Sequence, residues 1–190
     1  MKKRILALDI GNVCVKINPQ NCADALGLTV LPEAVRALCR DFEWGQAGEE
    51  GTVFAKAAEI LDNRFSAEKI KEAFNTILIE AVPGMSELVS SFPAMGVEAF
   101  FFSDISVTHL VRTEELFPAF SCVKGGVFSF ETGAWKPAKA MFETFESRCG
   151  IPDLYVDDRK ELIEAAQKHG WNAAVFAGAE DLREKLTALS

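Results

Sequence analysis

The sequence has little histidine, no excess of basic residues and no long hydrophobic run, and each absence excludes a class of function. Only two histidines, His109 and His169, occur in 190 residues. A Ser-His-Asp triad therefore has little to build on, and structural roles are expected for both. The net charge of −8 argues against nucleic acid and anionic membranes as main partners. No apolar stretch approaches the ~20 residues of a transmembrane helix.

Cysteine is present but without a pattern. The five cysteines form no C-x-x-C pair and are odd in number: Cys14, Cys22, Cys39, Cys122 and Cys149. This excludes a disulfide or zinc framework and favours reduced thiols that pack as apolar groups. The basic residues at 2–4 resemble the start of a signal peptide, but the apolar run that follows stops at Asp9, too early for its hydrophobic region. We therefore expect a cytoplasmic protein.

What remains is an ordinary globular composition, with 49% hydrophobic and 25% charged residues. A chain of this length suits one core domain with a modest insertion. Strand and helix patterns alternate regularly from residue 82 onward, which is typical of a parallel α/β sheet. We predict a Rossmann-like parallel sheet with helices on both faces, formed by residues 1–15 and 82–190. The segment shows helical patterns and no strand candidate between Ile17 and Ala81, so residues 16–81 predict an all-helical cap inserted after the first strand.

The individual elements follow from apolar spacing and from Gly and Pro breaks. Strands are expected at 5–8, 97–102, 154–156 and 171–176. Helices of the cap are expected at 21–28, 32–40, 52–61 and 66–79, with Ser66 as the N-cap of the last. Helices of the core are expected at 85–92, 107–116, 137–148, 159–169 and 180–189. Two short extended pieces around Gly125-Gly126 predict a hairpin.

Polar side chains follow three of these strands where each strand ends. Asp9 follows the first strand, Ser103-Asp104 the second, and Asp157-Asp158 a later one. Because the carboxyl ends of parallel strands lie on one edge of a sheet, these side chains are expected to meet. Asp9 alone could simply begin a turn, but polar residues at the ends of three strands favour a functional site at this edge.

The expected charges fit a metal ion. Three carboxylates, from Asp9, Asp157 and Asp158, would repel one another, and a bound Mg²⁺ removes this difficulty because it prefers oxygen ligands. A substrate phosphate can then approach a carboxylate nucleophile. Asp9 would form an aspartyl-phosphate, which splits one difficult displacement into two easier steps.

Other residues would bind the phosphate. Lys136 follows a tight Gly-Ala-Trp turn and would hold phosphate oxygens as a point charge. Ser103 would donate a hydrogen bond to a phosphoryl oxygen. The turn at Gly11 and Asn12 lets backbone amides approach the same oxygens closely.

The order of these motifs resembles the haloacid dehalogenase (HAD) superfamily over essentially the whole chain. The chain carries D-x-G-N-V at 9–13, S-D at 103–104, G-A-W-K-P at 133–137 and V-D-D at 156–158. The inserted helices resemble the superfamily's helical cap of the first type. The first motif resembles the D-x-G-[NG]-V form of small sugar-phosphate phosphatases and of the phosphatase domain attached to soluble epoxide hydrolases.

The resemblance implies an Mg²⁺-dependent phosphatase for a small phosphorylated metabolite such as a sugar phosphate, and leaves monomer and homodimer open. Asp9 would be nucleophile and metal ligand, the backbone carbonyl of Gly11 a second ligand, and Asp158, or Asp157 with it, would complete the metal site. The residues expected to contact substrate are Gly11, Asn12, Ser103, Asp104 and Lys136. Asp104 could instead cap the next helix, and Lys124 and Arg159 are expected to be surface charges.

One position departs from the superfamily. Most of its phosphatases carry a second Asp two residues after the nucleophile, which protonates the leaving group, and here that residue is Gly11. General acid catalysis is typically worth ~10²–10⁴-fold. The substitution predicts a preference for good leaving groups, such as anomeric sugar phosphates or aryl phosphates, or an acid borrowed from the cap or from water. The cap loop with Trp44, Gln46, Glu49 and Glu50 either serves the site or is simply solvated.

Two other functions compete with the phosphatase. A haloacid dehalogenase also uses an Asp nucleophile and lacks the second Asp. The acidic pair at 157–158 opposes it because dehalogenases use no metal site, as does Gly11, which replaces the Tyr usual in their first motif. A scaffold that binds a phosphorylated ligand or a partner without turnover is the third possibility.

Overall fold

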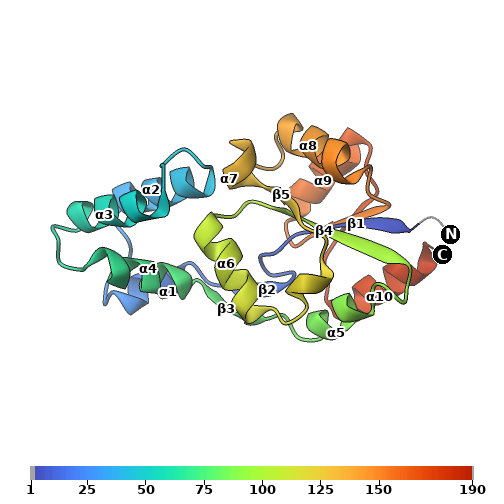
Figure 1. Ribbon diagram of the computed structural model, residues 1–190, viewed down its shortest axis with the longest axis horizontal. Coiled ribbons are helices and arrows are strands. Elements are labelled where there is room, and N and C mark those ends of the chain that lie inside the picture. The colour runs from blue at the N-terminus through green and yellow to red at the C-terminus, as the bar shows by residue number, and fades with distance from the viewer. Residues whose placement is uncertain (1–2, 190) are drawn as a thin grey trace.

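The computed structural model describes residues 3–189 and confirms the α/β prediction (Figure 1). Its main sheet has five parallel strands in the order β5-β4-β1-β6-β7. The strands are β1 (Arg4–Leu8), β4 (Val97–Ser103), β5 (Gly126–Phe128), β6 (Leu154–Asp157) and β7 (Ala173–Val175). β1 is central because its last three residues are apolar and fully buried, so both faces of the strand can be covered.

Helices cover both faces of this sheet. On one face α5 (Met85–Ser91) and α10 (Ala179–Ala188) pack on Leu6 and Leu8. On the other face α8 (Lys139–Cys149) and α9 (Lys160–His169) pack on Ala7. The remaining core helices are α6 (Val107–Leu116), the 3₁₀ turn Phe120–Cys122 and the short α7 (Ser129–Thr132). No helix within residues 3–189 is both long enough and apolar enough to span a membrane.

The inserted region has a core of its own. It consists of α1 (Gln20–Ala25), α2 (Glu33–Glu43), α3 (Glu50–Ile60) and α4 (Ala67–Asn75), and in Figure 1 it lies at the end of the molecule away from both chain termini. Phe42, Phe54 and Phe74 are the largest side chains of its buried cluster. As predicted, Ser66 caps α4, with its hydroxyl accepting from the Lys69 N–H at 3.2 Å. We call this region the cap.

Two short strands that the sequence does not predict flank the cap. β2 (Val15–Ile17) pairs antiparallel with β3 (Leu78–Ala81). The prediction that no strand occurs between Ile17 and Ala81 is therefore wrong at Leu78–Ala81. The apolar spacing of the predicted helix 66–79 continues through Ile77 and Leu78, but the helix ends at Asn75. Pairing with a partner some sixty residues away overrides the local pattern there, as is common for short strands.

The predicted hairpin around Gly125-Gly126 is also wrong. Residues 126–128 form β5, which runs parallel to β4, and Cys122 lies in the 3₁₀ turn. Gly126 is required for another reason, because a Cβ built on it would lie 2.4 Å from the Phe101 carbonyl oxygen. The missing side chain therefore allows the close approach of two strands rather than a reversal of the chain.

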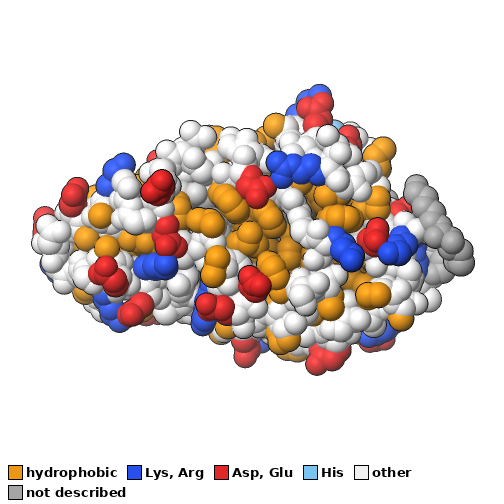
Figure 2. All heavy atoms as spheres, viewed as in Figure 1, with side chains coloured by type: hydrophobic (Ala, Val, Ile, Leu, Met, Phe, Trp, Pro, Cys, Tyr) orange, Lys and Arg blue, Asp and Glu red, His pale blue; other side chains and the backbone are white. Residues whose placement is uncertain are grey.

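The cap and the core contact one another through buried groups. His109 of α6 stacks on Phe74 of α4 with ring centroids 3.8 Å apart, and its Nε2 lies 3.0 Å from the Phe74 carbonyl oxygen. The Thr108 hydroxyl donates to Glu50 at 2.5 Å. Figure 2 shows hydrophobic side chains gathered in the middle of this face, where cap and core meet, with charged side chains mostly around them. His109 has the structural role expected of it.

Candidate active site

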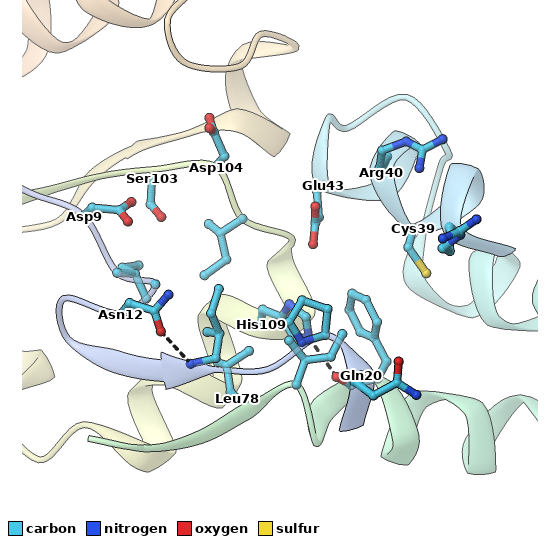
Figure 3. Close-up of a pocket in the computed structure, with 18 of the residues that line it drawn as sticks. Asp9, Asn12, Gln20, Cys39, Arg40, Glu43, Leu78, Ser103, Asp104 and His109 are labelled. Carbon is cyan, nitrogen blue, oxygen red and sulfur yellow. Dashed lines mark hydrogen bonds between the residues drawn. The ribbon is translucent and has the colours of Figure 1, made fainter. Parts of the chain in front are cut away.

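The strand ends meet at one edge of the sheet, as their order in the sequence predicts. Asp9 directly follows β1, Ser103 ends β4 and Asp157 ends β6, the strands on either side of β1. Figure 3 shows the Asp9 and Ser103 side chains beside each other at this edge, with Asp104 above them. Asp9, Ser103 and Asp157 are all buried, and Asp9 and Ser103 line the adjoining cavity.

Lys136 connects the carboxylates. Its buried Nζ donates to Asp9 Oδ1 at 2.8 Å, to Asp157 Oδ2 at 2.6 Å and to the Phe102 carbonyl oxygen at 2.9 Å. Its backbone N–H donates to Asp104 Oδ1 at 2.9 Å. The ammonium is therefore held at the nucleophile predicted from sequence, and it supplies the positive charge that two buried carboxylates need.

The electrostatics of the two carboxyl groups differ. Burial raises the pKa of Asp9 to about 6, with Lys136 opposing the rise and Asp157 adding to it. Burial would also raise the pKa of Asp157, but Lys136, the Tyr155 hydroxyl and the Arg159 N–H outweigh it and lower that pKa. For Lys136 burial works against the charged form, and the two aspartates nevertheless raise its pKa. A cation at this edge therefore stabilises the ionised form of Asp9.

The donor set fits a hard divalent cation. Carboxylate oxygens of Asp9, Asp157 and Asp158 lie within 4.8 Å of one another, and such all-oxygen sets suit Mg²⁺. The Asn12 side chain orients the third of these: its amide donates to Asp158 Oδ2 at 2.9 Å, while its carbonyl oxygen accepts from the Ile17 N–H at 3.1 Å. Asn12 has a left-handed backbone with φ of 52°, which Asn tolerates better than most residues.

A cavity of about 570 Å³ opens between this edge and the cap. From the core, Asp9, Ser103 and Asp104 line it, and Glu43, Arg40 and Cys39 line it from the cap. In Figure 3 the Glu43 carboxyl group lies on the side of the cap toward the core residues. Its other walls are largely apolar and include Ile17, Val30, Leu31, Phe74, Ile77 and Leu78. The volume is that of a small-molecule site.

Two roles that the sequence predicts change in the structure. Asp104 does not cap the next helix, because Ser106 is the N-cap of α6 and accepts from the His109 N–H at 3.2 Å. Arg159 is not a plain surface charge: it is partly buried and donates to Asp104 Oδ2 at 3.0 Å. Among residues 3–189 no group accepts from the Ser103 hydroxyl, which lines the cavity.

The cap loop contains anchors rather than free polar groups. The Trp44 indole N–H donates to the Gly133 carbonyl at 2.6 Å, and its ring lies 6.2 Å from that of Trp135. Glu50 accepts from Thr108 and pairs with Lys71 at 2.7 Å. These contacts tie the loop to the core, whereas Glu49 is exposed.

Two residues of the site are not predicted from the sequence. Tyr155 donates its hydroxyl to Asp157 Oδ2 at 2.5 Å from inside β6, and strand alternation could have placed it on the same face as Asp157. Glu43 falls in a loop by its sequence pattern, but α2 runs three residues past the predicted end at Arg40 and brings Glu43 to the cavity. The sequence pattern does not predict this position, because an acidic residue at the end of an amphipathic segment is usually solvent-exposed.

Comparisons with known proteins identify the fold. No protein-family model matches the chain, and no curated protein is significantly similar to it. A HAD family enzyme from Bacteroides thetaiotaomicron is similar in structure, with a TM-score of 0.79 at 18% identity over 94% of this chain and 95% of that one. Another structure of that enzyme contains magnesium and inorganic phosphate.

Two further structures have the same architecture. A predicted HAD-like family hydrolase from Porphyromonas gingivalis has a TM-score of 0.78 at 18% identity, over 100% of this chain and 98% of that one. The L-2-haloacid dehalogenase RSc1362 has a TM-score of 0.68 at 15% identity, over 98% and 100% of the two chains. The sheet order, the inserted helices and these similarities lead to one conclusion: the chain has the fold of the HAD-like hydrolases.

Proposed function

We propose that the protein is a Mg²⁺-dependent phosphomonoester hydrolase that forms an aspartyl-phosphate on Asp9 and acts on a small phosphorylated metabolite, such as a sugar phosphate. The observation that carries the proposal is that carboxylate oxygens of Asp9, Asp157 and Asp158 lie within 4.8 Å of one another, with Asp9 and Asp158 lining a cavity. Three carboxylates are a poor site for a dianionic phosphate alone but a good one for the phosphate together with a cation. The magnesium and phosphate bound by the Bacteroides enzyme support this reading.

The chemical steps use groups of this chain. A carboxylate oxygen of Asp9 attacks phosphorus, and the bond from phosphorus to the ester oxygen breaks. Lys136, already 2.8 Å from Asp9, balances the charge of the nucleophile, and Ser103 donates to a phosphoryl oxygen. Water then attacks the phosphorus of the aspartyl-phosphate, which releases inorganic phosphate and restores Asp9.

The metal would be held by Asp9, Asp157, Asp158 and the backbone carbonyl of Gly11. When bound, Mg²⁺ supplies positive charge that lets an anionic substrate approach an anionic nucleophile. Asn12 positions Asp158 through its amide, and Asp104 positions Lys136 and Arg159. These two residues therefore act by holding charged neighbours in place, and Asn12 also lines the cavity.

Hydrolysis of a panel of phosphate esters with and without Mg²⁺, for the parent and Asp9→Asn, tests the proposal. We expect phosphate release that requires Mg²⁺ and is lost in Asp9→Asn. Glu87→Gln, on α5 away from the site, is the matched acid-to-amide control and should remain active. Absence of turnover on every ester would instead favour the scaffold function.

A 2-haloacid belongs in the same panel, because L-2-haloacid dehalogenase RSc1362 has a similar fold. A dehalogenase would release halide without Mg²⁺ and leave the phosphate esters intact. The acidic triad favours the phosphatase, since attack on a monoanionic haloacid gives no reason to gather three carboxylates.

A further inference from the structure

The proposed hydrolase needs a proton for the leaving oxygen, and position 11 cannot supply it. Gly11 lines the cavity beside Asp9, and a Cβ built on it would lie 3.9 Å from Asp9 Oδ2. The same Cβ would lie 3.2 Å from Ile17 Cδ1, so Gly11 lets Ile17 pack closely beside Asp9 and offers no acid of its own. Some other group at the cavity has to protonate the leaving alkoxide, or only esters with good leaving groups will react.

Most carboxyl groups at the cavity are already engaged. Four line it: Asp9, Glu43, Asp104 and Asp158. Asp9 is the nucleophile, Asp104 accepts from Lys136 and Arg159, and Asp158 accepts from Asn12. Within residues 3–189, the Glu43 carboxyl group makes no hydrogen bond or ion pair.

Apart from the arginines, which stay protonated, the two other titratable groups that line the cavity are His109 and Cys39, and both are poor acids for this purpose. The Nε2 atom of His109 is engaged with the Phe74 carbonyl oxygen at 3.0 Å, between α6 and α4, so it is not available to protonate a leaving group. Burial raises the pKa of the Cys39 thiol to about 12, so it holds its proton too tightly. Glu43 is left as the group that can exchange a proton with a bound ester.

The contacts around Glu43 hold the backbone of this residue in place. Glu43 is the last residue of α2, and its carbonyl oxygen accepts from the Ser129 hydroxyl of α7 at 2.5 Å. Trp44 is fixed to Gly133, and Gly45 lies so close to the core that a Cβ on it would be 2.3 Å from the Phe130 carbonyl oxygen. In Figure 3 the Glu43 carboxyl group enters the cavity from the cap, opposite Asp9 and Ser103.

We propose that Glu43 is the general acid that donates a proton to the leaving oxygen as the bond from phosphorus to that oxygen breaks. The resulting carboxylate then removes a proton from the water that attacks the aspartyl-phosphate, which restores the protonated acid. This inference rests on the proposed phosphatase function and extends it. With Glu43 as the acid, the substrates include unactivated alkyl phosphates whose apolar group faces Leu31 and Ile77.

The charge environment supports a protonated Glu43 near neutral pH. Burial raises the pKa of Glu43 to about 7, Asp104 adds to the rise, and Arg159 and Arg40 oppose it. The other charged groups that line the same cavity are Asp9, Arg36 and Asp158. A pKa near the working pH is what acid and then base catalysis by one group requires.

The experiment compares Glu43→Gln with the parent on two esters of similar size, benzyl phosphate and 4-nitrophenyl phosphate, in the presence of Mg²⁺. The amide keeps the shape of Glu43 but cannot supply the proton. We expect kcat/KM for benzyl phosphate to fall ~10²–10⁴-fold, and that for 4-nitrophenyl phosphate to change little. The parent should also lose activity on benzyl phosphate as pH rises through the pKa of Glu43, and the variant should lack this limb.

Glu49→Gln, in the exposed part of the same loop, is the control and should match the parent on both esters. A folded Glu43→Gln enzyme whose kcat/KM for benzyl phosphate equals that of the parent, or whose kcat/KM falls equally for both esters, overturns the role of Glu43 and leaves the phosphatase standing. A parent that hydrolyses no ester overturns the phosphatase and this inference together. Retained hydrolysis of 4-nitrophenyl phosphate shows that the variant is folded.

Discussion

Lys136→Met tests whether the buried ammonium stabilises the fold through the two aspartates. The substitution keeps the length of the side chain but leaves Asp9 and Asp157 facing each other without the cation that now lies 2.8 and 2.6 Å from them. Removing one partner of a buried ion pair costs ~3–5 kcal/mol. Since a domain of this size loses ~2–4 °C of Tm per kcal/mol, we expect Tm in EDTA to fall by roughly 6–20 °C.

Added Mg²⁺ should restore part of this loss. A cation bound by the acidic triad replaces the missing charge and stabilises the folded state by mass action, so the variant should gain more stability from Mg²⁺ than the parent does. The measurement is urea or thermal unfolding in EDTA and in millimolar-range Mg²⁺. Without metal, the deficit should also shrink as pH falls, because loss of the cation raises the carboxyl pKa values and the folded variant then binds protons more tightly than the unfolded chain.

The matched control is Lys160→Met at the start of α9. That lysine is 80% exposed and lies 3.6 Å from Glu164, and surface pairs of this kind contribute ~0–1 kcal/mol. A Lys136→Met protein that unfolds in EDTA within about 1 kcal/mol of the parent would refute the reasoning, since the aspartates would then need no internal cation.

Two further substitutions test the packing that surrounds the site. Burial lowers the pKa of His109 from 6.5 to about 4, although the hydrogen bond with Phe74 opposes this shift. The unfolded chain therefore binds the proton more tightly than the folded protein does. The free energy of unfolding should fall by about 3 kcal/mol as pH drops from 6.5 to 4. His109→Gln should lose less over this window in urea unfolding; an unchanged pH slope would contradict the assignment. Gly126→Ala, whose Cβ would meet the Phe101 carbonyl, should destabilise by ~1–3 kcal/mol, whereas Gly51→Ala, with open space around it in α3, should be neutral or gain up to ~1 kcal/mol. Equal denaturation midpoints for the two glycine variants would contradict the close approach of the strands.

The sequence predicts the core and the edge of its sheet well because both depend on short-range signals. An apolar run that ends in a carboxylate, as at Asp9, needs only strand geometry to be interpreted. Parallel order then brings Asp9, Ser103 and Asp157 together without further information. The left-handed turn at Asn12 is likewise local. The close contact at Gly126 is not local, because it is made with Phe101 of another strand, and the sequence pattern there wrongly predicts a hairpin.

What the sequence could not predict depends on contacts between distant segments. β3 forms because Leu78 pairs with Ile17, and the sequence near residue 78 does not predict this pairing. Glu43 reaches the cavity because Trp44 and Ser129 hold the end of α2 against the core. Arg159 is drawn into the site by Asp104. Such placements follow from tertiary packing, which overrides local propensity.

The pairing of β2 with β3 has a consequence for the chain as a polymer. The chain leaves the core at Ile17 and returns at Leu78, so the inserted helices are, for the core, one long closed loop of roughly 60 residues whose ends already touch. Shortening such a loop to a turn of about four residues changes its closure entropy by only about 2 kcal/mol. The connection is thus a natural point for grafting, where one set of helices can be exchanged for another while the sheet edge and its carboxylates keep their register.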